Sequence, residues 1–496
     1  MRHSKEKDMN ILIIDVGTTS MRGVLYAEDG TILGMKRTPN HEEFFDNGWA
    51  IEPVSDWDNN LREIFSDIVS RFEPRSIDAV AITSQRSSII PMDRNGKALM
   101  DTIMWQDTRN AEICREFAKK NAEIFPVTGS RVNTVYSGSK MTWVRKEAPE
   151  EYKKVFKFVN IPEYMMYLLT GEYQSDVTYG SRTGLMNLYE KDWDDELLSL
   201  YEVKKEHLCP LNEAGAIIGK TSPKWEKLTG CPAGIPVISA GGDQQCGAIG
   251  QGVAGPGNLS IVTGTGAYGI AACGSIPKDL RDDVTCNASS IPGSYQLEAN
   301  IITCANAFDW AIRTLYGMDD KIDYDLIDQE LAAETQVAGC TLVPYFKGTG
   351  APDWNPNATA SFTGITLATR RSEMLKAVLE GIFMEMANKI DSISSYMDIN
   401  KVYVSGGMTN SSTICQLQAD IYGREILIKK DAETTAFGAF LVAMVSLGKY
   451  KDMEAAQAAL NPMNDVKIFR PDPEKHAAYK KKQAFMNKIY SAVRDL

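Results

Sequence analysis

The chain has 496 residues, more than a single hydrophobic core usually covers, so we expect two large domains. Hydrophobic residues make up 44% and charged residues 24%, a globular composition that excludes a wholly disordered or collagen-like chain. The net charge of −12 argues against nucleic acid and anionic membrane surfaces as partners, because both carry dense negative charge.

No apolar stretch approaches the roughly 18 residues that a membrane-spanning helix needs. The longest, residues 436–448, contains two glycines and a serine and predicts a buried helix. The opening residues are charged and show no secretory signal, and we expect residues 1–8 to be a short extension. Nine cysteines without a C-x-x-C pair and only four histidines predict free thiols, no zinc site and a cytoplasmic protein. The lysine-rich residues 475–488 predict a solvated face of a helix, not a binding patch.

The first strand signal is the apolar run 10–16, which enters a turn of glycine and hydroxyl residues before a second apolar run. This pattern predicts a β-hairpin whose turn presents backbone N–H groups to an anion. Asp15, near the end of the strand, could hold Mg²⁺ through water, and Arg22 could neutralise a phosphoryl group. An ordinary turn with a solvent-facing arginine is the alternative.

Polar side chains follow the next strand, which is predicted over residues 78–83. Gln85 and Arg86 come just after this strand, and Trp105 and Asp107 stand in a later polar segment. An amide, a guanidinium, an indole and a carboxylate can line a site for a polyhydroxylated ligand, because each hydroxyl needs a donor or an acceptor. The same residue types are also common in ordinary loops.

Asp243 follows the predicted strand 237–240 and two glycines, and it precedes a predicted helix. A carboxylate at the start of a helix can accept a hydroxyl proton during phosphoryl transfer, so Asp243 is a candidate general base. Simple helix capping is the alternative. The glycine-rich segment 250–257 predicts a boundary between one domain over residues 9–252 and another over residues 256–496.

A second hairpin is predicted over residues 258–272, and a further strand with its glycine turn over residues 401–407. Two hairpins about 250 residues apart indicate a duplicated unit. Alternation of strands with helices such as residues 377–395 indicates α/β domains. Residues 264–269 match a G-x-G-x-x-G string, but a strand follows it, which excludes a dinucleotide-binding motif. Residues 215–221 are one residue too short for a phosphate-binding P-loop.

In this order the motifs resemble those of the FGGY family of carbohydrate kinases, from residue 11 to about residue 448. The first hairpin is similar to the family's first phosphate-binding segment, and Gly-Gly-Asp-Gln-Gln to its catalytic turn. The other segments that resemble the family are the second phosphate hairpin at 264–266, the distinctive signature at 348–356, the adenosine segments at 405–407 and 416–420, and the helix at 433–439.

The resemblance implies an α/β fold of two duplicated actin-like (ribonuclease H-like) domains, with ATP and the sugar in the interdomain cleft. It implies ATP and Mg²⁺ as cofactors and a small sugar or polyol as partner, and it leaves room for a homodimer. Asp243 would be the general base, and Asp15 would place Mg²⁺ through water. The residues implied to contact the acceptor are Gln85, Arg86, Trp105, Asp107, Tyr136, Asp243 and Gln244. Those implied to contact ATP are Thr18, Thr19, Arg22, Gly264, Thr265, Gly406, Gly407 and Ser411.

Departures from the family's patterns bear on the acceptor. Glycerol kinases carry Arg-Glu where this chain has Arg86-Ser87, and their substrate tyrosine aligns with Val135, beside Tyr136. The Trp-Gln-Asp segment at 105–107 is instead similar to ketose kinases. We therefore expect ATP-dependent phosphorylation of a hydroxyl of a small carbohydrate (sugar, polyol or sugar acid), with a ketose-type acceptor favoured over glycerol. The alternatives are a glycerol kinase and an actin-like ATP-binding protein without kinase activity.

Overall fold

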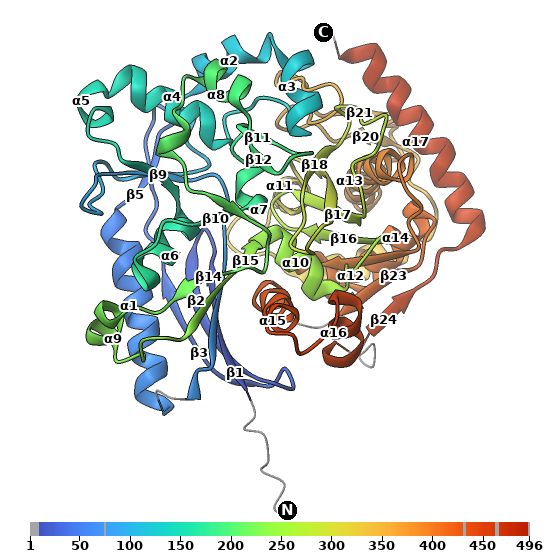
Figure 1. Cartoon of the computed structure of the whole chain (residues 1–496). Coiled ribbons are helices and arrows are strands. Elements are labelled where there is room, and N and C mark those ends of the chain that lie inside the picture. Colours follow the sequence, from blue (N-terminus) through green and yellow to red (C-terminus); the bar gives the residue numbers. More distant parts are fainter. Residues whose placement is uncertain (1–8, 74–75, 430–432, 462–465, 495–496) are drawn as a thin grey trace, which may run out of the picture.

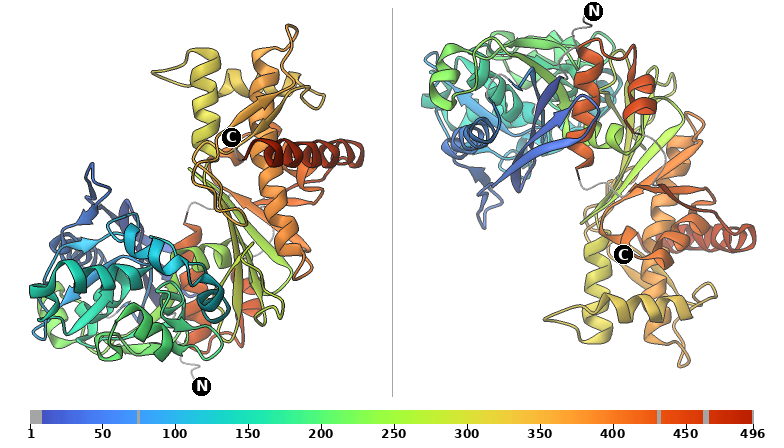
Figure 2. Two further views of the ribbon diagram at one scale, coloured as in Figure 1. Left: turned by 90° about the horizontal axis from the view of Figure 1, so that it is seen from above. Right: turned by 90° about the horizontal axis from the view of Figure 1, so that it is seen from below.

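The computed structural model describes residues 9–73, 76–429, 433–461 and 466–494. The chain forms two α/β lobes, which Figure 2 shows from above and from below. The expected extension over residues 1–8 lies outside the described residues.

The first lobe is built on a six-stranded sheet with the order β14-β15-β6-β1-β2-β3 (Figure 1). The predicted hairpin lies between β6 and the edge strand β3, and the hairpin's first strand pairs in parallel with β6, the strand that precedes Gln85. The strands of this sheet are β1 (Asn10–Val16), β2 (Ser20–Ala27), β3 (Ile32–Pro39), β6 (Ala79–Ser84), β14 (Ile217–Lys220) and β15 (Pro236–Gly242).

The second lobe is built on a seven-stranded sheet with the order β18-β19-β17-β16-β22-β23-β24. Its strands are β16 (Asn258–Thr263), β17 (Ala267–Cys273), β18 (Thr285–Ala288), β19 (Tyr295–Ile301), β22 (Lys401–Ser405), β23 (Ile426–Lys429) and β24 (Val466–Phe469). In both sheets an antiparallel hairpin (β1–β2, β16–β17) is followed on one side by two parallel strands (β6 and β15, β22 and β23). This shared topology confirms the predicted duplication. The G-x-G-x-x-G string runs into strand β17, which begins at Ala267, and does not open a helix, so the exclusion of a dinucleotide motif is confirmed as well.

Helices and small sheets surround the first sheet. The helices are α1 (Val54–Arg71), α2 (Ala111–Ala118), α3 (Asn121–Thr128), α4 (Ser137–Glu147), α5 (Pro149–Tyr152), α6 (Ile161–Thr170), α7 (Val177–Gly180), α8 (Asp195–Tyr201), α9 (Pro223–Thr229), α10 (Asp243–Gln251) and the short 3₁₀ turn η2 (Lys205–His207). A five-stranded sheet contains β4 (Glu43–Phe44), β5 (Ala50–Glu52), β7 (Ile89–Met92), β8 (Thr102–Ile103) and β9 (Lys157–Asn160). Two strand pairs are β10 (Ser175–Asp176) with β13 (Leu211–Asn212), and β11 (Met186–Asn187) with β12 (Asp192–Trp193).

The second half of the chain carries longer helices. They are α11 (Ala305–Tyr316), α12 (Tyr324–Ala333), α13 (Arg371–Ser394), α14 (Ser412–Tyr422), α15 (Thr434–Ser446), α16 (Met453–Leu460), α17 (Pro473–Val493) and the 3₁₀ turn η3 (Gly407–Asn410), with a small sheet of β20 (Thr341–Val343) and β21 (Ser361–Thr363). The predicted buried helix is α15. The solvated lysine face of α17 has one exception, because Lys482 is buried and pairs with Glu380 of α13.

The two halves of the chain interlock through α10 and α15. Helix α15 comes from the second half, yet it packs on β1, β6 and β15 of the first sheet and shares one apolar core with them (Figure 1). Helix α10 packs against α15 and also contacts strands of the second sheet. The proposed boundary near residues 252–256 marks the linker between α10 and β16, but it does not separate two independent cores.

Two expectations from the sequence, on membrane-spanning helices and on cysteines, can be compared with the described part of the chain. No helix within it is long and apolar enough to cross a membrane. All nine cysteines are buried and unpaired, as predicted.

Candidate active site

Three parallel strand ends bring the site together. Val16 at the end of β1 lies opposite Ser84 at the end of β6, and Ser84 lies opposite Gly242 at the end of β15. The polar segments that follow these strands therefore emerge at one edge of the sheet, where α/β proteins place their ligands. This is how Gln85, Asp243 and the first hairpin, far apart in the sequence, become neighbours.

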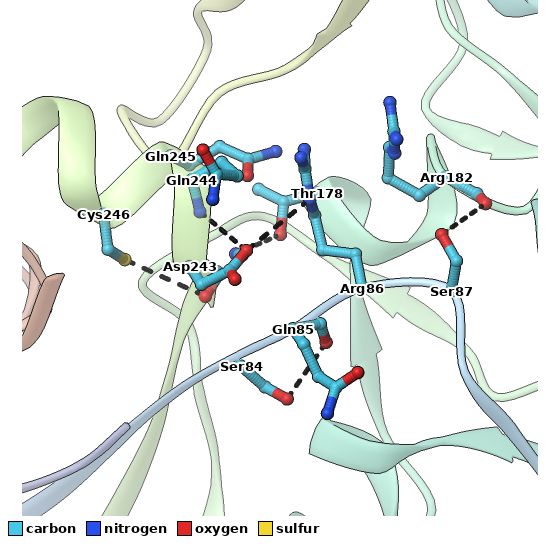
Figure 3. Close-up of polar contacts among 12 residues, drawn as sticks. Ser84, Gln85, Arg86, Ser87, Thr178, Arg182, Asp243, Gln244, Gln245 and Cys246 are labelled. Atoms are coloured by element: carbon cyan, nitrogen blue, oxygen red, sulfur yellow. Dashed lines mark hydrogen bonds and ion pairs between the residues drawn. The ribbon is translucent and has the colours of Figure 1, made fainter. Parts of the chain in front are cut away.

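Asp243 is the first residue of α10. The two residues before it are glycines, because neighbouring atoms leave no room for a side chain at either position. Gly241 has φ +96°, and a Cβ there would lie 2.2 Å from Ser290 Oγ. A Cβ at Gly242 would lie 2.6 Å from Arg86 Cδ, so glycine leaves room for the arginine. The turn is also held by Thr178, whose Oγ1 accepts a hydrogen bond of 3.1 Å from the backbone N–H of Gly242 (Figure 3). Asp243 is thus held rigidly at a helix N-terminus.

A cavity of about 480 Å³ opens beside Asp243, and we call it the acceptor cavity. Both lobes line it. Its residues are Thr18, Gln85, Arg86, Trp105, Asn133, Val135, Tyr136, Arg182, Asp243 and Gln244 from the first lobe, and Tyr268, Gly269, Ile270, Thr285, Glu298, Ala299, Asn300 and Trp354 from the second. Six of the seven residues expected to contact the acceptor therefore line one cavity, and Thr18, expected to contact ATP, lines it as well.

Charged side chains alternate along one wall of the acceptor cavity. Arg86 Nε lies 3.8 Å from Asp243 Oδ1, and Arg86 Nη1 donates to Glu298 Oε1 at 2.8 Å. Figure 3 shows Arg86 between Asp243 and Arg182. Burial raises the pKa of Asp243, and Arg86 only partly offsets this effect. A carboxylate with a raised pKa is a better proton acceptor, as a general base requires.

Asp107 is the expected acceptor ligand that the structure places elsewhere. It is fully buried, and its two oxygens accept hydrogen bonds of 2.8 Å from the guanidinium of Arg109 and of 2.6 Å from the N–H of Ala50. It is not among the residues that line the acceptor cavity. Asp107 orders its own loop, because Arg109 next to it satisfies the buried carboxylate locally.

Lys140 joins the two segments that place Trp105 and Tyr136 in the wall of the acceptor cavity. Its buried ammonium donates to the carbonyl oxygens of Trp105, Thr134 and Val135. These three acceptors match the three N–H donors of a lysine. Burial lowers the pKa of Lys140 to about 7. Lys140 therefore holds the Trp105 segment against the segment that leads to Tyr136.

We expect Lys140→Met to lower stability by about 1–3 kcal/mol, the usual cost of leaving buried carbonyl groups without a donor. Acceptor KM should rise several-fold more than kcat falls, because the loosened segments line the acceptor cavity. Steady-state kinetics and thermal denaturation measure both effects. The exposed Lys146 on the same helix is the control, and Lys146→Met should change neither quantity. An unchanged KM in folded Lys140→Met would contradict this role.

The first hairpin pairs its two predicted ionic residues with each other. Arg22 Nη2 lies 2.7 Å from Asp15 Oδ2, and Arg22 Nη1 donates to Glu433 at 2.9 Å. Burial raises the pKa of Asp15 to about 7, and Arg22 opposes this effect. Within the described residues Asp15 Oδ1 is buried without a hydrogen-bond partner. A buried, unpartnered carboxylate oxygen suits a hydrated divalent cation, so the residues present fit the predicted Mg²⁺ site.

No cluster of three or more potential metal ligands (His, Cys, Asp, Glu) occurs in the described ranges. Mg²⁺ does not need such a cluster, because proteins hold it through one or two carboxylates together with phosphate oxygens and water. Asp15 and the phosphates of a bound nucleotide would form such a set.

A second cavity, of about 400 Å³, lies in the second lobe beside the turn that follows β22, and we call it the nucleotide cavity. Gly407 and Ser411 line it, as expected for residues beside a nucleoside. Its other lining residues are Ala305, Phe308, Asp309, Tyr324, Asp325, Ile327, Asp328, Leu331, Met408, Asn410 and Ile414. Apolar side chains with a few carboxylates suit a base and a ribose.

Five residues expected to contact ATP line neither cavity: Thr19, Arg22, Gly264 and Thr265, which were expected beside the phosphates, and Gly406, which was expected beside the adenosine. Thr19 and Thr265 are exposed at the tips of the two hairpins. Gly406 has φ +105°, and a Cβ there would lie 2.1 Å from the carbonyl oxygen of Thr263, so this turn needs glycine.

Sequence reasoning missed several residues of the acceptor cavity, above all Arg182 and Glu298. Glu298 is a carboxylate within the largely buried strand β19, and this unusual placement was a signal that could have been noticed. Arg182 follows the short helix α7 and carries no local signal. Asn133, Tyr268, Asn300 and Trp354 also reach the cavity only through the fold.

Comparison with known proteins places this geometry in context. The sequence model of the N-terminal domain of the FGGY family of carbohydrate kinases matches residues 10–250, and that of the C-terminal domain matches residues 259–447. The chain is similar to the glycerol kinase of Thermococcus kodakarensis, with 31% identity over 452 residues that cover 89% of each chain.

Solved structures agree with the fold. The gluconate kinase from Lactobacillus acidophilus superposes with a TM-score of 0.90 at 24% identity, covering 98% of each chain. Plasmodium falciparum glycerol kinase with ADP superposes with a TM-score of 0.88 at 25% identity, again covering 98% of each chain. The expected two-domain fold is therefore confirmed.

Proposed function

The chain belongs to the FGGY family of carbohydrate kinases, and from this premise we propose that it transfers the γ-phosphoryl group of ATP to a hydroxyl of a small polyhydroxylated acceptor bound beside Asp243. The single observation that carries the proposal is the position of Asp243. Its carboxylate starts α10, lies in a cavity lined by both lobes and has a raised pKa because it is buried.

The reaction is an in-line displacement. The acceptor hydroxyl gives its proton to Asp243 as its oxygen bonds to the γ-phosphorus, and the bond from that phosphorus to the bridging oxygen breaks to release ADP. Trp105 and Tyr136 form the wall against which the acceptor lies, and Gln85, Arg86 and Gln244 bond its hydroxyl groups. Enclosure between two lobes keeps water from competing with the acceptor.

Nucleotide binding divides between the lobes. Gly407 and Ser411 lie beside the nucleoside, and Thr18, Thr19, Gly264, Thr265 and Gly406 hold the phosphates from three turns. Arg22 stabilises the negative charge of the phosphates. To do so, its guanidinium would give up part of its contact with Asp15 or Glu433. Asp15 would hold Mg²⁺ through water, and the cation would supply positive charge that stabilises the phosphates during transfer.

We propose an acceptor with a longer carbon chain than glycerol, with ketoses as the leading class. Support comes from the size of the acceptor cavity, about 480 Å³, and from the polar side chains of Asn133, Arg182 and Asn300 around it. Ser87, which stands where glycerol kinases carry glutamate, bonds the carbonyl of Arg182 and adds no carboxylate to the cavity. Asp107 does not support a ketose acceptor, since both of its carboxylate oxygens accept hydrogen bonds from Arg109.

Glycerol is the second candidate, and the similarity to the Thermococcus kodakarensis glycerol kinase favours it. The two candidates differ in how much of the cavity they would fill. A three-carbon acceptor would fill less of the 480 Å³ cavity than a five- or six-carbon acceptor would.

The test is ADP release with MgATP across glycerol, erythritol, ketopentoses, ketohexoses and sugar acids. We expect one ketose to stand well above the others in kcat/KM, and the same acceptor to raise the melting temperature. A clear preference for glycerol would overturn the ketose proposal while leaving the reaction class intact. A uniform basal rate with every acceptor would favour an ATP-binding protein without kinase activity.

A further inference from the structure

Glu298 reaches across the cleft between the lobes. It lies on β19 of the second lobe, and its two partners, Arg86 and Arg182, belong to the first. Glu298 Oε1 accepts a hydrogen bond of 2.8 Å from Arg86 Nη1, and Oε2 lies 3.6 Å from Arg182 Nη1. One carboxylate thus connects two guanidinium groups of the opposite lobe.

Glu298 remains an anion in this setting. Burial alone would raise its pKa, but Arg86 and Arg182 lower the pKa of Glu298 to about 2. Gln296 on the same strand donates a further hydrogen bond of 2.6 Å to Oε1. Glu298 is therefore charged near neutral pH.

Arg86 stands between two carboxylates and is bonded to one of them. Its Nη1 is bonded to Glu298 at 2.8 Å, whereas its Nε lies 3.8 Å from Asp243 Oδ1, beyond hydrogen-bonding distance. The side chain of Arg86 lies against Gly242, the residue directly before Asp243, so its guanidinium is held close to this carboxylate as well. Glu298 is the contact that draws it the other way.

A full ion pair between Arg86 and Asp243 would weaken the general base. A guanidinium bonded to a carboxylate stabilises the anion and occupies the lone pairs that must receive the hydroxyl proton. The charged and titratable groups that face Asp243 are Asp15 from β1, Arg86 after β6, Tyr179 from α7, Arg182 after α7, Tyr268 from β17 and Glu298 from β19. Arg86 is the cation closest to pairing with Asp243, at 3.8 Å.

We propose that Glu298 is a positioning residue that keeps Arg86 from pairing fully with Asp243, and that it does so only while the two lobes lie together as they do here. This inference rests on the proposed function of Asp243 as general base. Because Glu298 belongs to the opposite lobe, separation of the lobes releases Arg86 to pair with Asp243. The base is then weakened whenever the cleft is open to water.

The test is the pH dependence of kcat for Glu298→Gln, measured with the preferred acceptor and saturating MgATP. The variant keeps the shape of the side chain but loses the charge that attracts Arg86. We expect kcat to fall about tenfold, at the lower end of what a general base contributes. The acid limb of the profile should move about one pH unit lower, because Asp243 gains an opposite charge at close range. Glu298→Asp should return most of that shift.

Asp282→Asn is the matched control. Asp282 of the second lobe pairs with Arg131 of the first at 3.0 Å, so this variant also removes an ion pair between the lobes, but neither residue lines the acceptor cavity. It should leave the acid limb where it is. An equal shift in this control would assign the effect to closure of the lobes in general and would overturn the proposal.

Glu298 also lines the acceptor cavity, so the competing explanation is that it contacts the acceptor directly. In that case Glu298→Gln would raise KM and leave the acid limb unmoved, which would overturn the inference. A readout independent of turnover is ¹³C NMR titration of the Asp243 carboxyl, assigned with Asp243→Asn. Loss of the Glu298 charge by itself lowers the pKa of Asp243, so the midpoint should fall further for Glu298→Gln in the unchanged chain than for Glu298→Gln in an Arg86→Met background, even if no acceptor is found. Equal falls in the two backgrounds contradict the proposal. Failure of the proposed function would be seen separately, because the protein without any substitution would then show no acceptor-dependent release of ADP.

Discussion

Asp243→Asn is expected to lower kcat by about 10²–10⁴-fold, the range that a positioned general base contributes. The amide is nearly isosteric with the carboxylate and keeps the oxygen that accepts the N–H of Gln244, so the start of α10 should remain intact. It cannot take the acceptor's proton at neutral pH. Affinities for ATP and the acceptor should therefore stay close to those of the unchanged chain.

Steady-state kinetics with the preferred acceptor measure the loss, and binding of ATP and acceptor by calorimetry measures the affinities. Asp282→Asn serves as control, because it also removes a carboxylate near the cleft but one that does not line the acceptor cavity. If Asp243→Asn turned over about as fast as the unchanged chain, the assignment of Asp243 as general base would be wrong. A loss of acceptor affinity without a loss of kcat would make Asp243 a binding residue only.

Gly438→Ala is expected to destabilise the protein by about 1–3 kcal/mol or more, the cost of forcing a methyl group into a closely packed interface. A Cβ at Gly438 of α15 would lie 1.8 Å from the carbonyl oxygen of Cys246 in α10. A Cβ at Gly250 of α10 would lie 1.9 Å from the carbonyl oxygen of Thr434 in α15. Backbone atoms cannot rotate away as a side chain would, so the helices must separate.

Activity should fall together with stability, because α10 begins at Asp243 and its separation from α15 would displace the carboxylate. Thermal denaturation and kcat measure the two effects. Gly247→Ala, on the facing helix α10, is the control, since the nearest contact of its Cβ would be Thr435 Oγ1 at 3.4 Å. There the gain in helix propensity, up to about 1 kcal/mol, should be the main effect. Equal melting temperatures for Gly438→Ala and the unchanged chain would contradict this packing.

The sequence alone determined the elements that depend on local patterning. The hairpin at β1–β2 and its counterpart at β16–β17 follow from apolar runs that meet at glycine and hydroxyl turns. The place of Asp243 at the start of α10 follows from a strand, two glycines and a helical run in succession. Such signals need no partner from elsewhere in the chain, because backbone preferences and alternation of apolar residues act over a few residues.

The tertiary structure alone decided which charged side chains meet. Asp107 is a plausible ligand in the sequence, yet Arg109 satisfies it inside its own loop. Glu298 lies 212 residues from Arg86, and only the closing of one lobe against the other brings them together. Likewise α15 belongs to the second half of the chain but completes the apolar core of the first sheet. The physical reason is common to all three: burying a charge or an apolar face requires a complementary surface, and only the folded chain determines which surface lies near enough to supply it.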